Sequence, residues 1–242
     1  MKHTATRPRN RNMKTDFAQQ MLGLLFPNRC PCCGIRIAAA ENICNDCIRE
    51  LNALRVPVTA WRAVQHDKDL PFAAEAAVYA YDGAARAGIL AVKDGSRSFA
   101  RHLSPLLADA VREICEPADI DLITWVPVSR RRRRTQGYAH AELLGRALAK
   151  ELHLPCRGGL LMQTHSRLRQ HMLTGADRTA FPAVFRRTDA DLTGKNVLLC
   201  DDVLTTGSTM RRCAALLREM GAECVYAAAG AYRLRDSHQK GI

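Results

Sequence analysis

Residues Asn196 to Met210 read NVLLCDDVLTTGSTM, and this stretch decides the fold of the chain. A short apolar run at 197–200 precedes two acids, Asp201 and Asp202. A hydroxyl-rich loop at 205–209 follows, and apolar residues then recur at helical spacing. A loop that opens a helix presents unpaired backbone N–H groups and the positive end of the helix dipole, which attract an anion. We therefore predict a phosphate site here, with an ordinary helix-capping turn as the competing interpretation.

The residues around this loop suit a phosphorylated sugar. Gly207 allows a close backbone approach, and two carboxylates suit ribose hydroxyls or a magnesium ion with its waters. The stretch resembles the phosphoribosyl-pyrophosphate (PRPP) motif of type I phosphoribosyltransferases. That resemblance implies that the acids hold the ribose 2′- and 3′-hydroxyls and that the loop holds the 5′-phosphate. The implied site comprises Asp201 and Asp202, which are also the catalytic candidates, together with Thr205, Thr206, Gly207, Ser208 and Thr209.

The composition limits the function classes. The 242 residues carry a formal net charge of +12, which favours nucleic acid, phosphorylated ligands or anionic membrane surfaces as partners. A basic protein without such a partner is the alternative. Ten cysteines, with no secretory signal and no apolar run long enough for a membrane helix, predict a reduced, cytoplasmic protein.

The sequence divides into parts of different character. The first residues are basic and polar, and Met13 is an alternative start. Proline residues and a lack of periodicity mark a connecting segment before the main domain. We expect a disordered basic arm at 1–16, a helix plus a four-cysteine module at 17–56, a linker at 57–74, the main domain at 75–235 and a tail at 236–242.

Two CxxC pairs lie within the four-cysteine module. Cys30 and Cys33 form the first pair, and Cys44 and Cys47 form the second. Two such knuckles favour a closed tetrahedral zinc site, which supplies folding energy to a segment too small for its own core. Cys32 is left as the spare thiol. Free or disulfide-bonded cysteines and an iron–sulfur cluster are the alternatives.

Strands and helices alternate through the main domain. This alternation predicts an α/β fold with a parallel sheet, in which ligands bind at the carboxyl ends of the strands. Asp201 and Asp202 fall at such an end. We expect strands at 76–81, 121–126, 196–200 and 224–231, and helices at 84–92, 99–114, 138–152 and 208–220.

The order of motifs resembles the ComF family. A four-cysteine module is followed by YDGAARAGILAVKDG, by WVPVSRRRRRTQGYAHAELLGRALA and by VLLCDDVLTTGSTM, over about residues 17–233. The resemblance implies a type I phosphoribosyltransferase-like parallel sheet with flanking helices, preceded by a small zinc-ribbon-like module. That family is linked with natural competence and the uptake or use of DNA. The implied partners are PRPP, single-stranded DNA and DNA-uptake proteins.

By the same resemblance, Val128, Ser129 and Arg130 lie in the loop that cradles pyrophosphate. Magnesium and Arg130 would stabilise the charge of the leaving group. A solvated basic loop is the alternative for the arginine run 130–134. Lys93 matches a lysine of the family, and it either contacts phosphate or caps its helix.

Several positions depart from the family pattern. Residues 136–140 read QGYAH where the family shows an RGFNQ-like stretch, and Ala180 replaces an asparagine near a mobile hood at 164–178. Thr205 stands where purine-salvage enzymes carry an aspartate. Three functions stay open: a PRPP-binding protein of DNA uptake, an active phosphoribosyltransferase on a small molecule, and a PRPP sensor without chemistry.

Overall fold

The structure is a computed structural model of the chain, and it describes residues 28–57, 72–129, 133–134, 140–164 and 184–233. The predicted arm at 1–16, the first helix, most of the linker at 57–74, the tail at 236–242 and most of the hood at 164–178 lie outside the described residues. Among the described residues, no helix is both long enough and apolar enough to cross a bilayer.

Four parallel strands form the central sheet, in the order β1-β6-β5-β2. They are β1 (Ala74–Ala80), β2 (Leu122–Trp125), β5 (Asn196–Leu204) and β6 (Cys224–Tyr232). The predicted α/β parallel sheet is confirmed. The largest boundary error concerns β5: the strand predicted to end at Cys200 continues to Leu204, because β5 stays paired with β6 as far as Leu204 opposite Tyr232.

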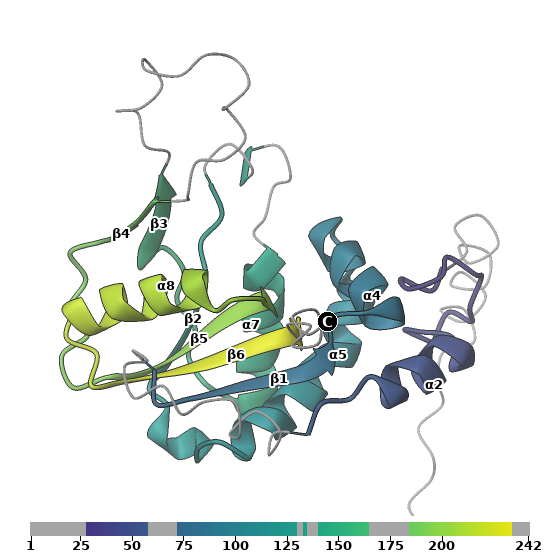
Figure 1. Cartoon of the computed structure of the whole chain (residues 1–242), viewed down its shortest axis with the longest axis horizontal. Helices are drawn as coiled ribbons and strands as arrows, with labels where there is room; N and C mark the ends of the chain where they lie inside the picture. Colours follow the sequence, from purple (N-terminus) through teal and green to yellow (C-terminus); the bar gives the residue numbers. More distant parts are fainter. Residues whose placement is uncertain (1–27, 58–71, 130–132, 135–139, 165–183, 234–242) are drawn as a thin grey trace, which may run out of the picture.

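Helices cover both faces of this sheet (Figure 1). On one face lie α4 (Gly83–Lys93), α5 (Arg97–Arg112) and α7 (His140–Leu152), and on the other lies α8 (Ser208–Glu219). A short 3-10 helix, η1 (Pro117–Asp119), leads into β2. The pleat of β5 alternates its side chains between two cores: Leu198 and Cys200 join the α4, α5 and α7 side, and Val197 and Leu199 join the α8 side.

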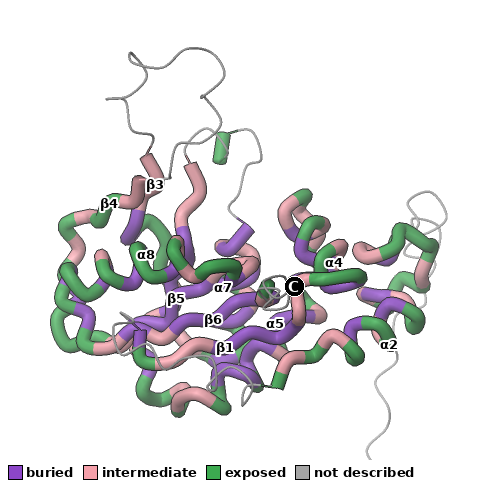
Figure 2. The backbone as a smooth tube through the Cα atoms, in the orientation of Figure 1, coloured by how far each residue is buried: buried purple, intermediate pink, exposed green. Residues whose placement is uncertain are grey.

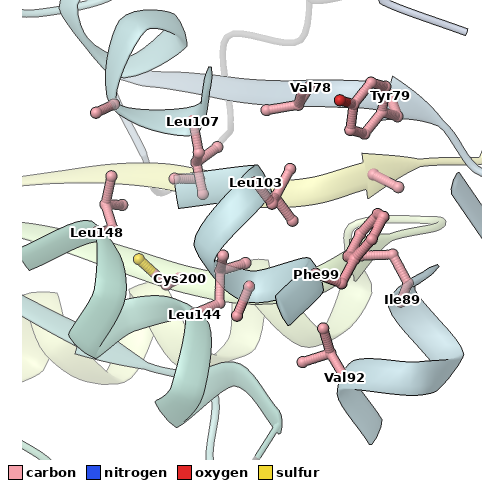
Figure 3. Packing of buried hydrophobic residues seen from close by; sticks show 14 of the residues in the cluster. Val78, Tyr79, Ile89, Val92, Phe99, Leu103, Leu107, Leu144, Leu148 and Cys200 are labelled. Atoms are coloured by element: carbon pink, nitrogen blue, oxygen red, sulfur yellow. The ribbon is translucent and has the colours of Figure 1, made fainter. Parts of the chain in front are cut away.

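The first of these cores is drawn in Figure 3. Leu103 and Leu107 of α5 pack with Leu144 and Leu148 of α7 around Cys200 of β5, and all five side chains are buried. The spacing of four residues along each helix places each leucine pair on one stripe. This packing holds β5, and so the acids that follow Cys200, in a fixed position.

A second, smaller sheet was not predicted. β3 (Leu161–Thr164) and β4 (Val184–Arg187) pair antiparallel beside the carboxyl ends of the main strands. The sequence interpretation left 156–185 as a short apolar piece and a polar stretch. β2 (LITW) is equally short but is apolar apart from Thr124, whereas β3 (LMQT) and β4 (VFRR) each end in two polar residues and so give no strand pattern.

The four-cysteine module lies against the sheet domain through α2 (Asn45–Ala53), which packs beside α4 (Figure 1). After α2, Val56 donates its backbone N–H to the oxygen of Val78, and Ala80 donates to Leu54, so this segment pairs with the outer edge of β1. Figure 2 shows that buried residues run along the main strands, whereas the module is largely exposed or intermediate.

Candidate functional site

Two acids and a lysine meet near the carboxyl end of β5. Asp202 lies on the same face of β5 as Cys200, two residues before it, and this face is covered by α4. The Nζ of Lys93, at the end of α4, lies 3.0 Å from Oδ2 of Asp202. The two side chains are only 13% and 25% exposed, so water screens this ion pair less than one on the surface. Lys93 was predicted either to cap its helix or to serve the site. It is the last residue of α4, and its amine enters the site.

The carboxyl group of Asp201 is harder to ionise than that of an ordinary aspartate. Burial raises the pKa of Asp201 well above the ordinary value, and the nearby charge of Asp202 raises it further. The backbone N–H of Asp202, which donates to Asp201 Oδ1 over 2.8 Å, and the Lys93 ammonium both act in the opposite direction. The acid pair therefore favours a cation or hydrogen-bond donors, which would stabilise its second negative charge.

The loop after β5 is held by its own hydroxyl groups. Thr206 Oγ1 donates to Ser208 Oγ over 3.0 Å and accepts from the backbone N–H of Ser208 over 3.3 Å. Gly207 adopts the left-handed conformation, with φ of +71°, directly before α8. Any other residue would be strained there, because a Cβ disfavours that conformation. Thr205, Thr206 and Ser208 remain exposed, so their polar groups are available to a ligand.

A pocket of about 180 Å³ lies beside the acids. Five of the predicted site residues line it: Lys93, Val128, Asp201, Asp202 and Thr209. Thr205, Thr206, Gly207 and Ser208 form the adjoining turn instead. Ser129 bridges to Gln163 at the rim of the small sheet, and Arg130 lies outside the described residues.

Sequence reasoning missed other members of the site. Gln163 and Phe185 come from the unpredicted small sheet and line the same pocket. His140, one of the two histidines that the sequence places nearest the site, also lines it and is buried at the start of α7. Arg211 lies beside the loop, since a Cβ built on Gly207 would be 3.6 Å from its guanidinium. The spacing of four between 207 and 211 on a helix is the signal that would have indicated it.

Part of the arginine run is held against α7. Glu142 Oε2 lies 3.5 Å from Arg133 Nη2, and Glu142 Oε1 pairs with Arg146 over 2.9 Å. The Glu142 side chain is only 13% exposed. Arg133 is therefore directed towards α7, although its side chain, like Arg134, remains exposed.

The four predicted zinc ligands converge. The Sγ atoms of Cys30, Cys33, Cys44 and Cys47 all lie within 4.8 Å of one another, and those of Cys33 and Cys44 are 3.6 Å apart. Zinc–sulfur bonds of about 2.3 Å in a tetrahedron place sulfurs roughly 3.8 Å apart, so the donor set fits a structural zinc ion. Burial raises the pKa of Cys32 to about 12, which keeps this spare thiol protonated.

Comparison with known families agrees with both parts. Residues 73–240 match the family described as "Phosphoribosyl transferase domain", and residues 21–59 match "Double zinc ribbon domain". The chain belongs to the phosphoribosyl transferase domain family. The predicted ComF-type arrangement, in which a zinc ribbon precedes such a domain, is confirmed by these two matches and by relatives that bear competence and DNA-utilization names.

Curated relatives align with only part of this phosphoribosyl transferase domain protein. DNA utilization protein YhgH of Escherichia coli K12 is 31% identical over 105 residues, 43% of this chain and 46% of that protein. Competence protein F of Haemophilus influenzae is 31% identical over 131 residues, 51% of this chain and 56% of that protein. The chain thus spans about half the length of these relatives. A ribose-phosphate pyrophosphokinase of Thermococcus kodakarensis is 54% identical over 41 residues, 17% of this chain and 15% of that protein.

Similar solved structures include a PRPP amidotransferase and a phosphoribosyltransferase. Glutamine PRPP amidotransferase from Bacillus subtilis has a TM-score of 0.39 at 19% identity, covering 56% of this chain and 27% of that one. Adenine phosphoribosyltransferase from Thermoanaerobacter pseudethanolicus has a TM-score of 0.38 at 20% identity, covering 60% of this chain and 84% of that one.

Proposed function

We propose that the chain binds PRPP, or a related ribose phosphate, at the carboxyl end of β5. The observation that carries this proposal is the pocket in which Asp201, Asp202 and Lys93 lie beside the Gly207 turn at the start of α8. Parallel sheets bind ligands at this edge, and a helix N-terminus favours a phosphate. The membership in the phosphoribosyl transferase domain family supports the same ligand class.

Each part of the ligand has a matching group. In this proposal residues 205–209 hold the 5′-phosphate through backbone N–H and hydroxyl donors, and Asp201 and Asp202 accept the ribose hydroxyls. Lys93 and the loop at 128–130 offset the charge of the pyrophosphate. Magnesium, for which carboxylate and phosphate oxygens are suitable ligands, would neutralise pyrophosphate charge when bound.

Calorimetric titration with PRPP and magnesium tests this proposal. Asp202→Asn removes one ribose acceptor and the partner of Lys93, and we expect at least about tenfold weaker binding, as for the loss of a charged hydrogen bond. Asp109→Asn is the matched control, because Asp109 pairs with Arg112 on the exposed surface of α5. Binding that Asp202→Asn leaves unchanged would refute the site.

Whether PRPP reacts separates three versions of this function. We favour a PRPP-binding protein of DNA uptake; the alternatives are an active phosphoribosyltransferase on an unknown small acceptor and a PRPP sensor without chemistry. The departures at 136–140 and Ala180 support the first and third. Pyrophosphate release with a panel of acceptors distinguishes the transferase from the other two: release identifies a transferase, and binding without release excludes it.

DNA is the proposed macromolecular partner, with DNA-uptake proteins as further partners in the cytoplasm. The net charge of +12 supports a polyanion, and the names of the two 31%-identical relatives concern DNA utilization and competence. Binding of fluorescent single-stranded DNA should weaken with salt, because contacts to phosphates release counterions. Neutralising Arg131 to Arg134 should reduce the salt slope, and an unchanged slope would rule out this run as the contact.

A further inference from the structure

A carboxylate of the four-cysteine module caps a helix of the sheet domain. Glu50 Oε1, on α2, accepts the backbone N–H of Ala84 over 2.8 Å in the first turn of α4. Asp82, directly before α4, accepts the N–H of Gly83 over 2.8 Å. The start of α4 thus receives one acceptor from each part of the chain, and both carboxylates lie at the positive end of its dipole.

The fit around this cap is close. Gly83 has φ of +41°, and a Cβ there would overlap the carboxylate of Glu50 and touch Leu54. Beneath the cap, Leu51 of α2 and Ala85 of α4 are fully buried in the same hydrophobic cluster. The position of α4 therefore depends on where the module places α2.

Helices α2 and α4 together connect the cysteine site with the candidate ribose phosphate site. Cys44 directly precedes α2, and Cys47 lies within it, one turn before Glu50, so the predicted zinc ion would fix the start of α2. At the other end of α4, about 16 Å away for a helix of this length, Lys93 pairs with Asp202. A single helix thus joins the capped end to the acid pair.

We propose that Glu50 is a positioning residue for the ribose phosphate site, through which the zinc module sets the place of Lys93. This inference rests on the proposed function. Zinc binding and PRPP binding are then coupled through α4, and each ligand strengthens the affinity for the other by the same factor. The module acts as a support for the ligand site in addition to any partner that it binds.

PRPP titration of the zinc-loaded full chain tests the coupling. Glu50→Ala should weaken binding about fivefold, at the lower end of measured couplings between sites, without loss of zinc. Glu50→Gln keeps the acceptor for Ala84 and should bind within about twofold of wild type. Asp46→Ala, an acid of the same helix that pairs with Arg49, should bind as wild type does. In a Lys93→Ala background Glu50→Ala should have no further effect, and a fully additive effect would overturn the proposal.

A second measurement needs no PRPP. The rate of acetylation of Lys93, relative to that of the exposed Lys150 on α7, reports how firmly its amine is held. Glu50→Ala should raise this rate severalfold, and Asp46→Ala should leave it unchanged. If the wild-type chain does not bind PRPP but Glu50→Ala still raises the Lys93 acetylation rate, the proposed function is wrong. The control of Lys93 by the module is then still supported. An unchanged Lys93 rate would overturn the coupling.

Discussion

The four-cysteine module and the sheet domain hold their shapes by different means. Within residues 28–57 only Cys30, Ile43, Cys47 and Leu51 are buried, and two of these are proposed metal ligands. The sheet domain buries two large apolar clusters, one on each face of its strands, and the four buried residues of the module lie at the margin of one of them. The difference indicates that a metal replaces a core where the chain is too short to build one, and that packing suffices elsewhere.

Loss of the metal should give the largest effect, and it should unfold the module without unfolding the sheet domain. Cys44→Ser removes one of four ligands, so we expect zinc content to fall from one equivalent to near zero and residues 28–57 to become susceptible to protease. The sheet domain should keep its circular dichroism spectrum. Metal analysis and limited proteolysis measure this, and a metal-free chain with a protected module would contradict it.

A cavity in the sheet domain should destabilise that domain without releasing zinc from the module. Leu103→Ala removes a fully buried side chain and should lower the free energy of unfolding by about 3 kcal/mol. Denaturant titration measures the loss. Leu90→Ala is the control, because Leu90 is 37% exposed, and should cost less than about 1 kcal/mol. If Leu103→Ala released zinc at low denaturant concentration, the two regions would not be separate in stability.

The ionised carboxylate of Asp201 should lower the free energy of unfolding of the sheet domain. The pKa of Asp201 is raised, so its contribution to stability is present at acid pH and is lost as pH rises through the raised value. Asp201→Asn should unfold at a higher temperature than wild type at pH 8, with the difference narrowing towards about pH 4. Thermal scans across pH measure this; a lower unfolding temperature at pH 8 would argue against a destabilising carboxylate.

Surface ion pairs should contribute least. The Asp109 and Arg112 side chains are 64% and 47% exposed and 2.8 Å apart. Asp109→Ala should change the free energy of unfolding by less than about 0.5 kcal/mol, because water and salt screen such pairs. A larger loss would mean that the end of α5 matters more to the sheet domain than its exposure suggests.

Local spacing predicted most of the elements and part of the site. The helices predicted at 84–92 and 208–220 lie within one residue of α4 and α8, and the two CxxC pairs indicated which sulfurs converge. The small sheet was missed because β3 and β4 are short and half polar, and Gln163 and Phe185 of the pocket were missed with it. The pairing of Lys93 with Asp202 joins residues far apart in sequence, so no local pattern could decide between a cap and a site residue.

The sequence by itself determined the zinc ligands and the strand–loop–helix unit that contains DDVLTTGST. Both depend on residues close together in the chain, whose geometry follows from spacing and backbone preference. Only the tertiary structure decided the strand order β1-β6-β5-β2, the pairing of Lys93 with Asp202 and the cap that Glu50 places on α4. These contacts depend on how the whole chain buries its apolar faces, and the total apolar surface buried cannot be evaluated from any one stretch of sequence.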